Sequence, residues 1–193
     1  VDFQSRQVSR PDNLNEDNID WVKTENVAAI IEGDTYPNQY IVLTAHLDHV
    51  GTENGEIFKG ADDDGSGSMA LLEIAEAIKL AELDGNRPKR SIVILHVSAE
   101  EKGLLGSKYY SENPLYPLDD TITNLNLDMS GRTDPTRNSN NDEYIYLIGT
   151  DRLSTMLHKT SEEVNDRTVN LELDYRFNAW DDPNRFYERI DHW

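Results

Sequence analysis

The chain of 193 residues contains no cysteine, which excludes disulfide bonds and thiolate metal ligands. No apolar run approaches the roughly 18 residues that a membrane-spanning helix needs. The chain begins with polar residues, so no signal peptide is visible, and no internal repeat stands out. A mature secreted protein would have the same features after processing.

Basic residues are also scarce, because 18 lysines and arginines stand against 37 acidic residues and give a formal net charge of -19. Such a surface repels nucleic acid and anionic lipid, so neither nucleic acid nor a membrane is an expected partner. The hydrophobic content of 37% is that of a globular protein. The length suits one domain with a substantial core and is too short for two comfortable ones.

Strands and helices alternate along the chain after a polar stretch, residues 1–22, that lacks a clear period. Strands are predicted at 26–33, 39–48, 90–101, 121–131, 143–149 and 169–173, and helices from 66 onward, at 103–113 and at 154–164. In the first helix Leu71, Ile74, Ala75 and Ile78 form one apolar stripe, and Asp64 or Ser66 can cap it. This pattern predicts an α/β fold with a mostly parallel central sheet and helices on both faces.

Polar side chains gather where the predicted strands end. His46 and Asp48 end one strand, Glu100 and Glu101 end the next, and Asp128 ends a third, while Asp62 lies in a glycine-rich loop before a helix. Ligands bind at the carboxyl edge of an open α/β sheet. We therefore expect these separate stretches to converge in space.

Histidine combined with carboxylates, and no thiol, is the ligand set of a catalytic zinc or a related divalent ion. One of two adjacent glutamates can bind metal while the other holds a proton, which is the apparatus of metal-assisted hydrolysis. Each piece alone has an ordinary explanation: "DDDGSG" as a capping turn, "EE" as a solvated pair, and His96 as a core histidine. The combination in chain order is what favours a site.

The segments "TAHLDHVG", "KGADDDGSGSMALLEIA", "SAEEKGLLGS" and "NLDMSG", in that order, resemble the bacterial di-zinc leucyl aminopeptidases, a family with a three-layer, zinc exopeptidase-like fold. The resemblance runs from about residue 26 to the end of the chain. It implies that His46 and Asp128 hold one zinc and that Glu101 holds the other. Asp62 would bridge the two ions.

The same resemblance implies further roles. Glu100 would be the general base and acid, and Asp48 would orient His46. A non-proline cis peptide bond would join Asp62 to Asp63.

The final segment "ERIDHW" resembles a pocket segment of the family, which implies substrate-binding positions at Asp191 and His192. Ile190 stands there in place of the usual serine. A histidine that normally completes the second zinc site lies in a family segment without a counterpart in this sequence, so one or two zinc ions are expected. We accordingly divide the chain into an N-terminal arm, 1–22, and a peptidase catalytic domain, 23–193, whose C-terminal elements are missing.

The sequence thus predicts a zinc aminopeptidase, secreted or periplasmic, that acts on peptides with a free N-terminus. Two alternatives remain open. One is a metal-binding but catalytically impaired domain, and the other is a single-zinc acyl transferase that resembles the glutaminyl cyclases. Intact "ADDDGSG" and "EE" favour the peptidase over the cyclase.

Overall fold

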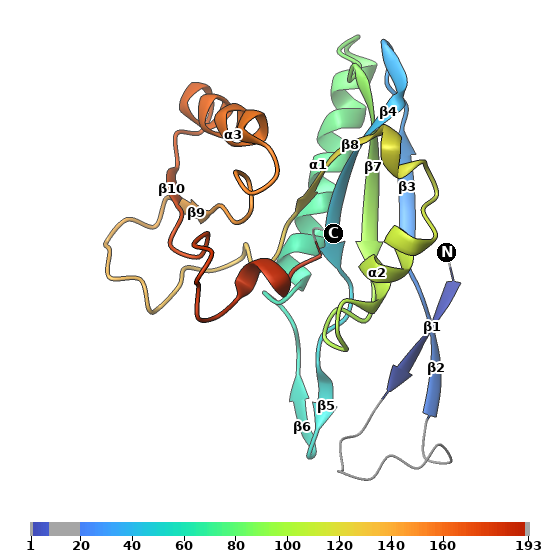
Figure 1. Ribbon diagram of the computed structural model, residues 1–193, viewed down its shortest axis with the longest axis vertical. Coiled ribbons are helices and arrows are strands. Elements are labelled where there is room, and N and C mark those ends of the chain that lie inside the picture. The colour runs from blue at the N-terminus through green and yellow to red at the C-terminus, as the bar shows by residue number, and fades with distance from the viewer. Residues whose placement is uncertain (1, 8–19, 192–193) are drawn as a thin grey trace. The chain divides into compact units, whose positions relative to one another are not determined.

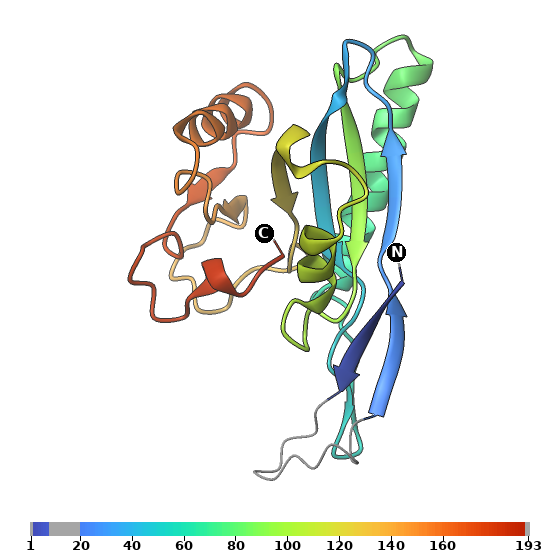
Figure 2. The ribbon, with the colours of Figure 1, turned by 45° about the vertical axis from the view of Figure 1, so that its right-hand side comes forward.

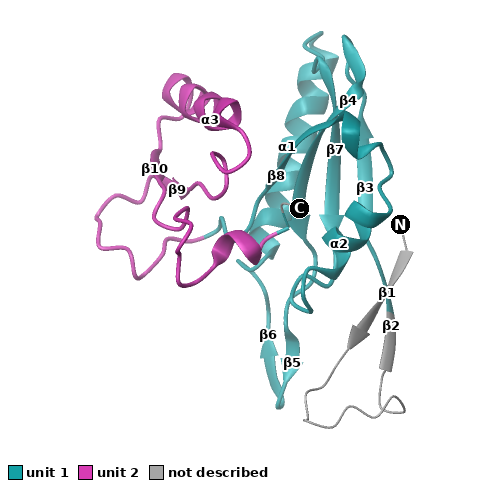
Figure 3. Cartoon of the chain, in the orientation of Figure 1, with its two compact units in different colours: residues 1–131, 191–193 teal, residues 132–190 magenta. Residues whose placement is uncertain are grey.

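The computed structural model describes residues 2–7 and 20–191. The strands are β1 (Asp2–Gln7), β2 (Asp20–Glu25), β3 (Val27–Ile31), β4 (Tyr36–His46), β5 (Gly51–Glu53), β6 (Glu56–Phe58), β7 (Arg90–Val97), β8 (Thr121–Asn126), β9 (Tyr144–Tyr146) and β10 (Glu172–Asp174). The helices are α1 (Gly65–Leu83), α2 (Leu105–Glu112) and α3 (Thr155–Arg167), with short 3-10 turns at Leu118–Asp120 and Phe186–Glu188. The chain forms two compact units, unit 1 (1–131 and 191–193) and unit 2 (132–190), shown in Figure 3.

A four-stranded sheet in the order β3-β7-β4-β8 forms the centre of unit 1 (Figure 1). Strand β4 pairs in parallel with β7 and with β8, which confirms the predicted mostly parallel sheet. The edge strand β3 is antiparallel to β7. In the N-terminal stretch, where the sequence predicted no regular element, β1 pairs antiparallel with β2. The domain boundary placed at residue 22 stays a prediction.

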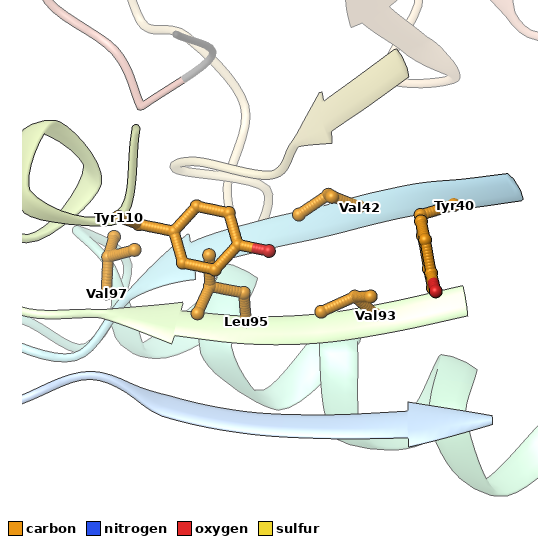
Figure 4. Close-up of a cluster of buried hydrophobic side chains, with 6 residues drawn as sticks. All are labelled: Tyr40, Val42, Val93, Leu95, Val97 and Tyr110. Atoms are coloured by element: carbon orange, nitrogen blue, oxygen red, sulfur yellow. The ribbon is translucent and has the colours of Figure 1, made fainter. Parts of the chain in front are cut away.

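The two faces of this sheet bury different clusters, because successive strand residues point to opposite sides. On one face Tyr110 of α2 packs with Val42 and Leu95 (Figure 4). On the other face Leu71 of α1 packs with Leu43, and its side chain is completely buried. Burial of a leucine side chain contributes about 1.5–3 kcal/mol. Helix α1 therefore lies along one face, as Figure 2 also shows.

Helix α1 begins where the sequence predicts, and its first turn fixes the glycine-rich loop. The Asp64 carboxylate caps the helix by accepting a hydrogen bond from the Gly67 N–H at 2.9 Å. A Cβ atom at Gly67 would lie only 2.5 Å from the carbonyl oxygen of Leu127, so only glycine fits this close approach. The contact holds the loop of residues 60–64 beside the segment that follows β8.

Unit 2 contains the parallel pair β9 and β10 together with α3. The Ser154 side chain caps α3 by accepting a hydrogen bond from the Leu157 N–H at 3.1 Å. Within residues 2–7 and 20–191, none of the helices is both long enough and apolar enough to cross a membrane.

Candidate metal centre

The candidate site lies in unit 1, at the carboxyl edge of three adjacent parallel strands. Strand β4 ends at His46, the Glu100–Glu101 pair follows β7, and Asp128 follows β8. Because these strands lie side by side and run in the same direction, their ends meet at one edge. The loop before α1 reaches the same edge and adds Asp63.

A first group of possible metal ligands consists of His46, Asp63 and Asp128. The His46 Nε2 atom lies 3.1 Å from Asp63 Oδ1 and 3.9 Å from Asp128 Oδ1. The imidazole is 1% exposed. Burial alone would lower the pKa of His46, but the carboxylates of Asp128 and Asp64 outweigh it and raise that pKa. The imidazole therefore faces strong, concentrated negative charge.

A second group consists of His49, Asp63 and Glu101. The His49 Nδ1 atom lies 2.7 Å from Glu101 Oε1 and 3.9 Å from Asp63 Oδ1. Asp63 belongs to both groups, and its Oδ1 atom lies within 3.9 Å of a nitrogen of each imidazole. A carboxylate between two imidazoles is suited to two neighbouring ions.

The three consecutive aspartates make different contacts, and the groups of possible ligands contain Asp63 in place of Asp62, the residue predicted to bridge the ions. Asp62 Oδ1 accepts a hydrogen bond from the Gly131 N–H at 2.7 Å, so Asp62 anchors the segment after β8 instead of joining either group. Asp64 caps α1 and also accepts from the His46 N–H at 3.1 Å. Only Asp63 faces both histidines. The cis peptide bond lies between Asp63 and Asp64, one residue later than expected.

Asp48 contacts His46 through its backbone carbonyl and contacts the glutamate pair through its carboxylate. The His46 Nδ1 atom lies 2.8 Å from the backbone oxygen of Asp48, whereas the Asp48 carboxylate stays 3.9 Å away. Since a carbonyl oxygen can only accept, Nδ1 carries a proton, and Nε2 is the nitrogen that faces the site. The Asp48 carboxylate instead accepts from the N–H groups of Glu100 at 3.1 Å and Glu101 at 3.3 Å. It thereby ties the end of β4 to the glutamate pair.

Glu100 lies in neither group of possible ligands, although it adjoins Glu101. Ala99, just before the pair, has a left-handed backbone conformation with φ 59°, so the chain bends where β7 gives way to the glutamates. Burial raises the pKa of Glu100 to about 8. A carboxyl group of this kind can hold or release a proton near neutral pH.

Of the two predicted substrate-binding positions, the structure describes one, Asp191. Asp191 is 1% exposed, and its Oδ1 atom accepts a hydrogen bond from the Ser107 hydroxyl. It borders a cavity of about 30 Å³, and burial raises its pKa to about 6. His192 lies outside the described residues.

Four buried atoms of the two groups have no hydrogen-bond partner: His46 Nε2, His49 Nδ1, Glu101 Oε1 and Asp128 Oδ1. Each is a typical zinc-binding atom. Ligand atoms about 2.0–2.2 Å from a tetrahedral ion stand roughly 3.4 Å apart, and the observed separations of 2.7–3.9 Å surround that value. Burial raises the pKa of Asp128. The donor set therefore fits divalent metal.

The interpretation of the sequence missed His49. Its signal is the spacing in "HLDH", which places a second histidine three residues after His46 and directly after Asp48. A family pattern that expects the second imidazole elsewhere gives no reason to select it.

Comparisons with known proteins identify a family and several relatives. Residues 26–192 match the family described as peptidase family M28. The probable glutamate carboxypeptidase LAMP1 of Arabidopsis thaliana is 36% identical over 107 residues, which are 55% of this chain and 15% of that protein. The aminopeptidase NAALADL1 of Rattus norvegicus is 36% identical over 109 residues, 55% of this chain and 14% of that protein.

Among solved structures, BSAP, a zinc aminopeptidase from Bacillus subtilis, superposes with a TM-score of 0.62 at 24% identity. The superposition covers 80% of this chain and 36% of the Bacillus chain, and it shows a shared fold. The chain thus spans well under half the length of each of these three proteins.

Proposed function

Because the chain belongs to peptidase family M28, we propose that the protein is a metal-dependent aminopeptidase with two zinc ions in its site. The observation that carries the proposal is the pair of ligand groups that share Asp63. In this proposal His46, Asp63 and Asp128 would hold one ion, and Asp63 and Glu101 would contribute to the other. The complete domain would have the three-layer, zinc exopeptidase-like arrangement, and the protein would be secreted or periplasmic.

The side chains around the ions divide the chemical work. When bound, the zinc pair polarises the peptide carbonyl and makes water more acidic. A Glu100 carboxylate oxygen takes a proton from the attacking water and passes it to the leaving amine nitrogen. Asp48 holds Glu100 and Glu101 in place through their backbone N–H groups. The Asp48 carbonyl keeps the proton of His46 on Nδ1.

The charge of the site supports an aminopeptidase over a carboxypeptidase. The relatives include both kinds by name. A peptide with a free N-terminus brings an ammonium group, which an acidic site attracts, whereas a C-terminal carboxylate needs a cationic partner. Among the ion pairs recorded for residues 20–191, the carboxylates of Asp63, Glu101 and Asp128 contact only histidine.

The test is hydrolysis of a leucyl chromogenic amide by the full-length protein, before and after chelation and after zinc is restored. We expect chelation to abolish turnover and zinc to restore it. The N-acetylated form of the same amide is the matched control, and it should not be cleaved. Cleavage of the acetylated substrate would contradict the proposal. So would formation of an N-terminal pyroglutamyl residue with loss of ammonia from an N-terminal glutamine peptide, without hydrolysis of the leucyl amide.

A further inference from the structure

We propose that His49 is a ligand of the second ion, so that the four residues His46–His49 supply one imidazole to each of the two metals. The inference rests on the proposed metal site and assigns a residue in it. It makes the second group, His49 with Asp63 and Glu101, a complete set of three protein ligands, the usual number for a catalytic zinc.

The backbone delivers the two histidines to the two sides of Asp63. Strand β4 ends at His46, and the next N–H, of Leu47, still bonds to the Val97 carbonyl at 2.8 Å. The chain then turns, and His49 Nδ1 reaches within 2.7 Å of Glu101 Oε1, after the neighbouring strand β7. The side chains of His49 and Glu101 are about one-fifth exposed, so the position is partly shielded from water.

The loop before α1 is shaped around this imidazole. Gly60 has a φ of 60°, and a Cβ atom added there would lie 2.6 Å from the Cβ and 2.8 Å from the Cγ of His49. Any larger residue at position 60 would displace the ring. The close packing restricts where His49 can lie, as a metal ligand requires.

The contact between His49 and Glu101 is not an ordinary hydrogen bond. Although Nδ1 and Oε1 are 2.7 Å apart, neither atom has a partner in hydrogen-bond geometry, and both are buried from solvent. Both atoms can donate an electron pair, and a cation placed between them and the Asp63 carboxylate would bind both. A simple ion pair would instead direct the ring proton at the oxygen.

Zinc content of the full-length protein tests the assignment. After saturation with zinc and gel filtration, we expect about two zinc ions per wild-type chain and about one per His49→Gln chain, because loss of a ligand should weaken that ion by at least the 10–100-fold typical of an outer-sphere loss. His158→Gln is the matched control, since His158 lies in α3 and pairs with Thr150. It should retain both ions.

A second measurement does not need the His49→Gln variant, because it observes His49 in the wild-type chain. Zinc titration of protein labelled with ¹⁵N-histidine should shift the His49 Nδ1 resonance as the second equivalent binds, and Glu101→Gln should suppress that shift. This readout decides the question if His49→Gln fails to fold by circular dichroism.

The zinc measurements distinguish failure of this inference from failure of the proposed function. Two zinc ions held by His49→Gln with wild-type affinity would overturn the inference, as would an unmoved His49 resonance. A third outcome is a single zinc in the wild type, which His46→Gln removes and His49→Gln leaves in place. That result would overturn the assignment of His49 and would support the site at His46. No zinc in the wild type would overturn both this inference and the proposed function.

Discussion

Unit 1 and unit 2 both concentrate acidic side chains, but they neutralise them in opposite ways. In unit 2 Asp174 lies 3.2 Å from both Arg137 and Arg176. Burial alone would raise the pKa of Asp174, yet hydrogen bonds from these arginine residues lower it. Hydrogen bonds from Thr136 and Tyr146 lower the pKa of Asp134 to about 2. These carboxylates are ionised, and arginine residues of the same unit balance their charge.

At the candidate metal centre of unit 1 the pKa values of the carboxyl groups move the other way. Burial raises the pKa of Glu100 to about 8 and also raises the pKa of Asp128. Their recorded partners are imidazoles and each other rather than arginines. The difference teaches that unit 2 carries its own counter-charges, whereas the carboxyl groups at the edge of unit 1 have the cation-accepting character that the proposed metal site requires.

The largest effect that would sharpen this comparison concerns Glu100. Glu100→Gln removes the group that moves the proton, so we expect the leucyl amide turnover to fall by about 10²–10⁴ while zinc content stays unchanged. Glu112→Gln, at the exposed end of α2, is the control and should keep its rate. Loss of zinc in Glu100→Gln would show that Glu100 is a ligand.

The next largest effect separates two neighbouring aspartates. Asp63→Asn removes a carboxylate shared by both groups, so zinc affinity should fall by more than the roughly 10–100-fold expected for an outer-sphere loss. Asp62→Asn keeps an oxygen for the Gly131 N–H and should bind zinc nearly as the wild type does. Calorimetric zinc titration of the two variants measures the difference. A larger loss in Asp62→Asn would restore the assignment made from sequence.

Removal of metal should affect the two units unequally. Zinc at a hundred times its Kd stabilises the folded state by about 2.7 kcal/mol, or roughly a hundredfold in exchange through unfolding. We expect chelation to speed hydrogen exchange at residues 60–67 and 99–104 of unit 1 and to leave 155–167 of unit 2 unchanged. Equal acceleration in both units would remove the distinction between them.

The smallest effect is a stability change of opposite sign in the two units, which depends on pH only in unit 1. The pKa of Asp191 is raised to about 6, so the metal-free protein loses its contribution to stability as pH rises from about 4 through 6. Asp191→Asn should therefore gain thermal stability relative to the wild type at pH 7.5 more than at pH 4.5. Asp134→Asn in unit 2 should instead lose stability at both pH values, because the pKa of Asp134 is about 2. Thermal unfolding of the wild type and both variants at the two pH values measures these changes. A loss of stability in Asp191→Asn at pH 7.5, or a gain in Asp134→Asn, would contradict the expectation.

The sequence predicts the strands that carry the site and the start of α1, since strand patterns and the apolar stripe are local signals. It does not distinguish Asp62 from Asp63, because consecutive aspartates have the same local signal. Residues distant in the sequence make the difference: the Gly131 N–H binds Asp62, and the His46 N–H and the start of α1 bind Asp64, so that Asp63 is left for the site. The antiparallel pairing of β3 cannot be predicted from the sequence either, since it depends on a contact between distant segments. The spacing in "HLDH" marks His49 but does not show that its side chain approaches Glu101.

Anomalous diffraction at the zinc edge, from crystals of the zinc-loaded protein, tests the central claim most directly. Two peaks should appear, one within about 2.0–2.2 Å of His46, Asp63 and Asp128, and the other at that distance from His49, Asp63 and Glu101. Asp63 should touch both. Peaks bound through Asp62, or no peak at this edge of the sheet, would contradict the account.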